Sequence, residues 1–136
     1  MRLDFTLSPL SKDIDFLTQK INEETKDAGS AYPFAFYIRG DKEEIIAGCN
    51  GSVIFTTIHI DQLWVHPDYR GSGKGRELME HVHEMGRKKG CKLATVVTMD
   101  FQGAREFYER LGYICDFERG GGDNTKMYFL QLIFPT

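Results

Sequence analysis

The chain has 136 residues, of which 41% are hydrophobic and 27% are charged, and its formal net charge is −3. This length suits one domain that buries about two thirds of the surface of its unfolded chain, and no apolar run approaches the ~20 residues of a membrane helix. With a negative net charge, the chain lacks the clustered Lys and Arg by which nucleic-acid binders contact phosphates.

The first half of the chain predicts a strand, a helix and three more strands. Residues 2–8 alternate apolar and polar side chains until Ser8-Pro9 stops the pattern. Ser11 can cap a helix that runs to Ala28-Gly29. Three β-type runs follow, and a tight turn at 40–42 joins the first two as in an antiparallel meander. These runs cover residues 33–39, 44–55 and 56–65.

The second half predicts a helix between two parallel strands. Apolar residues recur at helical intervals from Leu78 to Met85, and Gly90 ends that helix before the β-type run of residues 92–99. A crossover helix makes the strands on either side of it parallel. Another helix ends at Gly112, with Ala104, Phe107, Tyr108 and Leu111 on one face, and strands at 113–118 and 125–134 follow.

These elements predict a single α/β domain over residues 1–136. Its mixed central sheet has antiparallel arms and a parallel centre, with about three main helices.

A glycine-rich loop before the central helix has the features of an anion site. The strand breaks at His66-Pro67, and Arg70-Gly71-Ser72-Gly73-Lys74-Gly75 then leads into the helix. Glycine lets the backbone approach a ligand, and the helix start adds roughly half a positive charge. Because glycine in the first helical turn costs about 1 kcal/mol relative to alanine, three alternating glycines favour binding over a mobile surface loop.

Two nucleotide-binding motifs resemble this loop but are incomplete. The triphosphate loop Gly-x-x-x-x-Gly-Lys-[Ser/Thr] needs glycine where Asp68 stands and a hydroxyl where Gly75 stands. The dinucleotide motif Gly-x-Gly-x-x-Gly needs its third glycine three positions after Gly73, whereas Gly75 follows after two. Coenzyme A is therefore the better candidate, and a nucleotide-phosphate binder is the weaker alternative.

Two motifs together resemble the GNAT superfamily of acyl-CoA-dependent N-acyltransferases. The family's loop, Gln/Arg-x-x-Gly-x-Gly/Ala, corresponds to residues 70–75 after Leu63-Trp64-Val65. Its second motif, Asn-x-x-Ala-x-x-Phe-Tyr-x-x-x-Gly-Phe/Tyr, is met by Ala104, Phe107, Tyr108, Gly112 and Tyr113. The asparagine is replaced by Phe101, so either the adjacent Gln102 substitutes for it or that cofactor contact is absent.

The resemblance implies an N-acetyltransferase that moves the acetyl group of acetyl-CoA to an amine in a ternary complex. Backbone N–H groups near residues 63–65 would hold the thioester and pantetheine where the strands splay apart, and the Tyr108 hydroxyl would be the general acid to the thiolate. The implied cofactor-binding residues are Leu63, Trp64, Val65, Arg70, Gly71, Ser72, Gly73, Lys74, Gly75, Gln102 and Phe107.

Asp61 is the candidate general base. Strand alternation places it on one face with His59, Leu63 and Val65, opposite Ile60, Gln62 and Trp64. An acid among apolar residues is a candidate for a raised pKa, although a solvated carboxylate is an equal alternative and a water chain would make a base unnecessary. A non-catalytic coenzyme A binding or sensing module would share the loop and the fold, and it is the alternative function.

Metals, membranes and nucleic acids are not expected as partners. The three cysteines have no Cys-x-x-Cys spacing, and His81 and His83 are two residues apart instead of the four that converge on a helix. Asp4 stands where a secretory signal would build its apolar core, so we expect a cytoplasmic protein. The expected partner is a small-molecule or peptide amine, whose identity stays open, as does formation of a homodimer.

Overall fold

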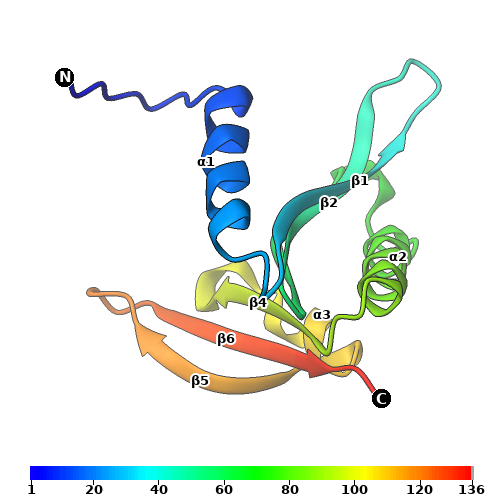
Figure 1. Cartoon of the computed structure of the whole chain (residues 1–136). Coiled ribbons are helices and arrows are strands. Elements are labelled where there is room, and N and C mark those ends of the chain that lie inside the picture. Colours follow the sequence, from blue (N-terminus) through cyan, green and yellow to red (C-terminus); the bar gives the residue numbers. More distant parts are fainter. Residues whose placement is uncertain (136) are drawn as a thin grey trace.

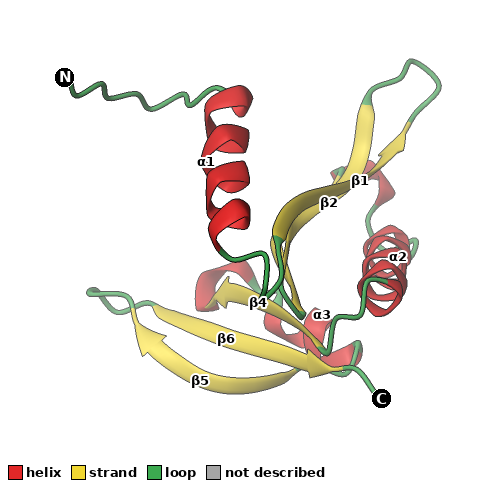
Figure 2. Cartoon of the chain, in the orientation of Figure 1, coloured by secondary structure: helices red, strands yellow, loops and turns green. Residues whose placement is uncertain are grey.

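The computed structural model describes residues 1–135, which form one six-stranded sheet with helices on its faces (Figures 1 and 2). In chain order the elements are α1 (Ser11–Glu24), β1 (Ala31–Arg39), β2 (Ile45–Ile54), β3 (Thr57–Val65), the 3-10 turn η1 (Pro67–Tyr69), α2 (Lys74–Lys88), β4 (Leu93–Met99), η2 (Asp100–Gln102), α3 (Arg105–Arg110), β5 (Ile114–Gly120) and β6 (Lys126–Ile133). None of these helices is both long enough and apolar enough to cross a membrane.

The strand order in the sheet is β1-β2-β3-β4-β6-β5. Only β3 and β4 pair in parallel within this described sheet, and the other neighbouring strands are antiparallel. The predicted mixed sheet, its parallel centre and the three α-helices are thus confirmed.

Helix α2 makes the main core by packing on the sheet. Its buried face carries Leu78, Met79 and Val82, and β3 supplies the fully buried Ile58 and Ile60 beneath it. Figure 1 shows α1 and α2 on opposite sides of β1 and β2. The face of these strands that points away from α2 is therefore left for other contacts.

The parallel pairing at the centre of the sheet is short. It joins only Thr57–Ile60 of β3 to Leu93–Val96 of β4, and residues 61–65 of β3 continue without β4 beside them. Figure 1 shows β1 and β2 diverging from β4, β6 and β5. The sheet consequently opens between β3 and β4 at the end that leads into the glycine-rich loop.

The strand predicted at residues 2–8 is wrong. These residues extend from the body of the protein (Figure 1), and Leu3, Phe5 and Leu7 are each more than four-fifths exposed. Alternation of apolar residues favours a strand only where a sheet edge also takes up the backbone hydrogen bonds. Within this segment, Ser8 N–H bonds locally to the Thr6 hydroxyl at 2.9 Å.

Helix α1 starts and ends differently from the prediction. Leu10 occupies the N-cap position, so Ser11 is the first helical residue and not the cap. The helix ends at Glu24, where the C-cap residue Thr25 leaves the helical backbone conformation with φ −110° and ψ 15°, and the Thr25 hydroxyl bonds back to the Ile21 carbonyl at 3.1 Å. All 14 residues of α1 are at least partly exposed. Two 2.7 Å bonds between the Asn22 side chain and the Ala31 backbone hold its C-terminal end to β1.

Candidate active site

The glycines of the loop fall into two groups by physical role. Gly71 and Gly73 have φ values of +79° and +85°, in the left-handed region that other residues occupy at a cost of about 1–2 kcal/mol. Gly75 lies in the first turn of α2, where a Cβ would stand 3.3 Å from the Phe107 ring of α3. The first two glycines therefore shape the loop, and the third lets α2 approach α3 closely.

This loop presents a row of free backbone donors. No backbone carbonyl in residues 1–135 accepts a hydrogen bond from the N–H groups of residues 71–76, and the first bond of α2 runs from Glu77 N to Gly73 O at 2.9 Å. Lys74 begins the helix, and Arg70 precedes it. Unpaired N–H groups at a helix start beside two cations are features suited to binding a phosphate.

Side chains within the loop fix its shape. Arg70 donates its Nε–H to the carbonyl of Val65 at 2.8 Å, which ties the loop to the end of β3. The Ser72 hydroxyl donates to the Tyr69 carbonyl, and Asp68 N–H donates to His66 Nδ1 at 3.0 Å. The donors at 71–76 are therefore held in place before a ligand arrives.

A hollow of about 610 Å³ connects this loop to the open part of the sheet. We call it the cofactor hollow. Its walls bring together ten of the eleven residues predicted to bind the cofactor. The eleventh, Ser72, lies outside the lining. The lining consists of Leu63, Trp64, Val65, Tyr69, Arg70, Gly71, Gly73, Lys74, Gly75, Arg76, Gln102, Ala104 and Phe107.

Gln102 lines the cofactor hollow but also closes the turn after β4. Its side-chain oxygen accepts hydrogen bonds from Met99 N–H at 2.7 Å and from the Thr98 hydroxyl at 3.0 Å. Phe101, which replaces the asparagine of the motif, is 71% exposed. The carboxamide oxygen of Gln102 is thus committed to the turn, and its NH₂ group is the part that can serve a ligand.

Tyr108 lies on α3 behind the open strand segment. Its side chain is 5% exposed and its ring contacts those of Phe107 and Tyr113 edge-on, at centroid distances of 5.2 and 5.5 Å. Burial raises the pKa of Tyr108, and the neighbouring Cys49 thiol raises it further. Cys49 pairs directly with Leu63 across β2 and β3. Tyr108 stays protonated close to this segment, although it does not line the cofactor hollow.

Asp61 occupies a β-bulge, which changes the predicted faces of β3. Asn50 pairs with Gln62 and Gly51 pairs with Ile60, so Asp61 is the extra residue. Ile60 and Leu63 consequently both pack against the core, whereas simple alternation placed them on opposite faces. Gly51 makes the bulge possible because any Cβ there would collide with the His59 carbonyl. The Asp61 side chain is 57% exposed, with its Oδ1 3.6 Å from His59 Nε2.

A model of the acetyltransferase (GNAT) family matches residues 5–113 of the chain. The chain belongs to this family. Blasticidin-S acetyltransferase from Streptomyces morookaense is 38% identical over 81 residues, which are 59% of each chain. The matched segments span less than two thirds of the curated relatives' lengths.

Solved structures support the same fold for this GNAT chain. An acetyltransferase from Bacillus cereus ATCC 14579 superposes with a TM-score of 0.73 at 20% identity, covering 96% of this chain and 98% of its own. An aminoglycoside 6′-N-acetyltransferase complexed with coenzyme A gives a TM-score of 0.67 at 15% identity, covering 84% and 78%.

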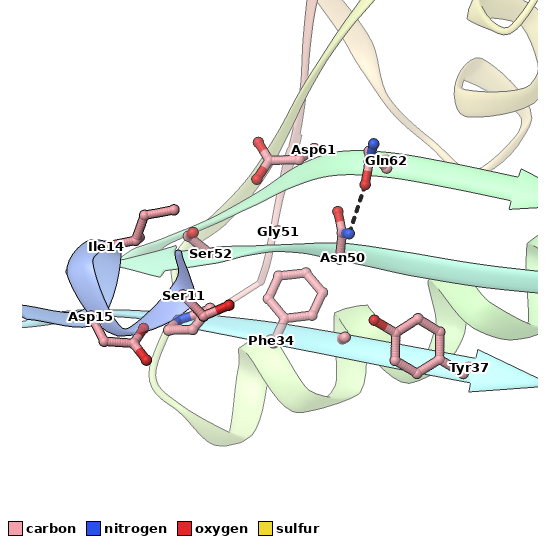
Figure 3. Close-up of a pocket in the computed structure, with 12 residues that line it drawn as sticks. Ser11, Ile14, Asp15, Phe34, Tyr37, Asn50, Gly51, Ser52, Asp61 and Gln62 are labelled. Atoms are coloured by element: carbon pink, nitrogen blue, oxygen red, sulfur yellow. Dashed lines mark hydrogen bonds between the residues drawn. The ribbon is translucent and has the colours of Figure 1, made fainter. Parts of the chain in front are cut away.

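A second hollow lies on the other side of β3 in this GNAT domain, between α1 and the sheet face opposite α2 (Figure 3). We call it the α1 hollow. It measures about 770 Å³ and includes Asp61. Asn50 and Gln62 meet in its wall through a hydrogen bond of 2.8 Å. The lining consists of Ser11, Ile14, Asp15, Pro33, Phe34, Ala35, Tyr37, Asn50, Gly51, Ser52, Asp61 and Gln62.

Apart from Asp61, the polar residues that β2 and β3 contribute to the α1 hollow were not predicted from the sequence. The sequence shows Asn50 and Ser52 as polar positions within an apolar β-type run. It does not show which strands pair with this run and bring these residues into the hollow. Tyr69 and Arg76 line the cofactor hollow but were not among the residues predicted to bind the cofactor. For Arg76, the signal was its charge in the first turn of the helix that follows the loop.

Proposed function

We propose that the chain is an acetyl-CoA-dependent N-acetyltransferase in which the amine attacks the thioester directly in a ternary complex. The observation that carries this proposal is the cofactor hollow, which runs from the unpaired N–H groups of residues 71–76 to the open edge of β3 at residues 63–65. The first end suits the phosphates of coenzyme A. The second offers backbone groups to the pantetheine arm and the thioester.

The chemistry needs one proton to leave the amine and one to reach sulfur. A lysine-like amine with a pKa of ~10.4 costs about 4–5 kcal/mol to deprotonate at pH 7. The neutral nitrogen then bonds to the thioester carbon, and the carbon–sulfur bond breaks as the tetrahedral intermediate collapses. We assign the Tyr108 hydroxyl as the general acid for the departing thiolate, because Tyr108 neighbours Cys49, which pairs with Leu63 in the segment that we propose holds the thioester.

Asp61 is our candidate for the group that accepts the amine proton. It lines the α1 hollow from the bulge, two residues before the segment 63–65 that we propose holds the thioester. Replacement by asparagine should lower kcat/KM. A kcat/KM value unchanged in Asp61→Asn would assign that proton to a water chain.

Release of free coenzyme A from acetyl-CoA across an amine panel tests the overall proposal. Blasticidin S belongs in the panel because a relative is named for its acetylation. Amine-dependent thiol release is the expected result. Tight binding of acetyl-CoA without thiol release from any amine would favour the alternative, a coenzyme A binding or sensing module.

A further inference from the structure

Three neighbouring hollows share lining residues, and together they mark out a path along the sheet from the cofactor loop to α1. A bridging hollow of about 370 Å³ shares Trp64 with the cofactor hollow and shares Tyr37, Asn50 and Gln62 with the α1 hollow. Because residues 61–65 of β3 have no β4 partner, this path passes the open segment of the sheet. A molecule in the α1 hollow can therefore extend a group towards the segment where the acetyl group would lie.

The lining of the α1 hollow has a definite chemical character. Its charged members are Asp15 from α1 and Asp61 from β3, and none of the lining residues that the structure describes is Lys or Arg. Figure 3 shows these two carboxylates on different sides of the hollow. Two anions around one concave site create a negative potential inside it, so the hollow favours positively charged molecules.

Neutral groups complete the lining beside the two carboxylates. The hydrogen bond from Asn50 Nδ2 to Gln62 Oε1 uses one donor and one acceptor, which leaves the Asn50 oxygen and the Gln62 NH₂ group for a ligand. The rings of Phe34 and Tyr37 add apolar surface. The volume of about 770 Å³ is within the range that holds whole small molecules.

We infer that the α1 hollow binds the acceptor and selects a small amine with a second positively charged group. This inference rests on the proposed function. The amine that reacts must be neutral when it attacks. By itself it therefore cannot supply the positive charge that pairs with the carboxylates of the hollow during transfer. A second cation remains charged throughout. In this arrangement Asp61 faces the reacting amine, and Asp15 holds the distal cation as the residue that determines specificity.

Matched linear amines test this inference. We compare 1,5-diaminopentane and 1,7-diaminoheptane with the monoamines of equal length, using free coenzyme A as the readout. The diamines should have kcat/KM values about three- to fivefold higher. Asp15→Asn should raise the KM of the diamines about three- to fivefold, as expected for loss of a solvent-exposed charge pair, and should leave their kcat and the KM of the monoamines unchanged.

Asp13→Asn is the control, because Asp13 lies on α1 two residues from Asp15 and outside the α1 hollow. It should behave like the unmodified chain. Equal KM values for diamines and monoamines, or equal effects of the two substitutions, would overturn the inference. So would a lysine peptide that is acetylated better than every diamine and is insensitive to Asp15→Asn, although the proposed transferase function would then stand.

Calorimetric titration of the same amines into the coenzyme A complex separates the two proposals. Diamine binding that is tighter than monoamine binding and is weakened by Asp15→Asn supports the inference even without thiol release, in which case the transferase proposal fails. If neither diamine binds nor reacts, the inference fails by itself.

Discussion

The Tyr108 hydroxyl can be removed with little change in packing, because phenylalanine preserves the ring that contacts Phe107 and Tyr113. If this hydroxyl protonates the thiolate, Tyr108→Phe should lower kcat about 100-fold while the Kd for acetyl-CoA changes less than twofold. Steady-state kinetics and calorimetry measure the two quantities.

Tyr113→Phe is the control for Tyr108→Phe. The Tyr113 hydroxyl is also buried, but it forms a hydrogen bond of 2.7 Å with His83 Nε2. Its loss should lower the free energy of unfolding by about 1 kcal/mol and leave kcat unchanged. Equal kcat values for Tyr108→Phe and the unmodified chain would remove Tyr108 from the mechanism.

Gly73 and Gly90 permit a paired test of the anion site, because both have left-handed backbone near opposite ends of α2. Their φ values are +85° and +81°, and a Cβ at either would meet no atom within 4 Å. Alanine at each position should therefore cost the same stability, about 1 kcal/mol. Only Gly73→Ala should weaken acetyl-CoA binding, measured by calorimetry. Equal affinities for the two variants would contradict the role of the Gly73 backbone.

The residues of the cofactor hollow were predictable because most follow one another in the chain. A strand end, a left-handed loop and a helix start are local features, so residues 63–65 and 70–75 could be assigned to one site from their order. The face of Asp61 was not predictable, because its bulge depends on the close approach of Gly51 to His59 across two strands. The capping role of Gln102 also appears only once the turn is folded.

At the level of elements, α2 carries a buried histidine that links stability to pH. His83 is 5% exposed, and burial, together with the nearby Arg87, lowers its pKa from 6.5 to about 4. Between these values the unfolded chain binds a proton that the folded chain excludes. The free energy of unfolding should therefore fall as pH drops from 6.5 to 4, by roughly 3 kcal/mol from this residue.

Urea unfolding at a series of pH values checks this dependence. His83→Gln keeps a hydrogen-bonding side chain opposite Tyr113 but cannot titrate in this range. The variant should lose less stability than the unmodified chain between pH 6.5 and 4. Parallel curves for the two proteins would show that His83 contributes nothing to the acid dependence.

Most elements were predictable from periodicity, and the exceptions lie where the chain has few tertiary contacts. Strands β1 to β6 lie within about two residues of the predicted runs, because apolar alternation and turn residues coincide there. Residues 2–8 have the same alternation without a sheet partner, and α1 begins without a side-chain cap. A local pattern of apolar residues determines secondary structure only where another part of the protein packs against or pairs with that segment.

For the whole molecule, acetyl-CoA should act as a stabilising ligand. A ligand at 100 times its Kd adds about 2.7 kcal/mol to the free energy of unfolding, which corresponds to a rise in Tm of about 8–10 °C for a domain of this size. ATP and NAD at equal concentrations should give much smaller rises in a thermal-shift assay. A rise with ATP that matched the rise with acetyl-CoA would favour a general phosphate site over one for coenzyme A.

The loose attachment of α1 has a consequence for how this domain can diverge. None of the 14 residues of α1 is buried, whereas positions of the proposed donor site such as Gly75 and Val65 pack against neighbouring elements. Substitutions on the inner side of α1 therefore change the wall of the proposed acceptor site at little cost in folding free energy. New acceptor preferences can arise by drift on this one helix, while the acetyl donor stays fixed by the core.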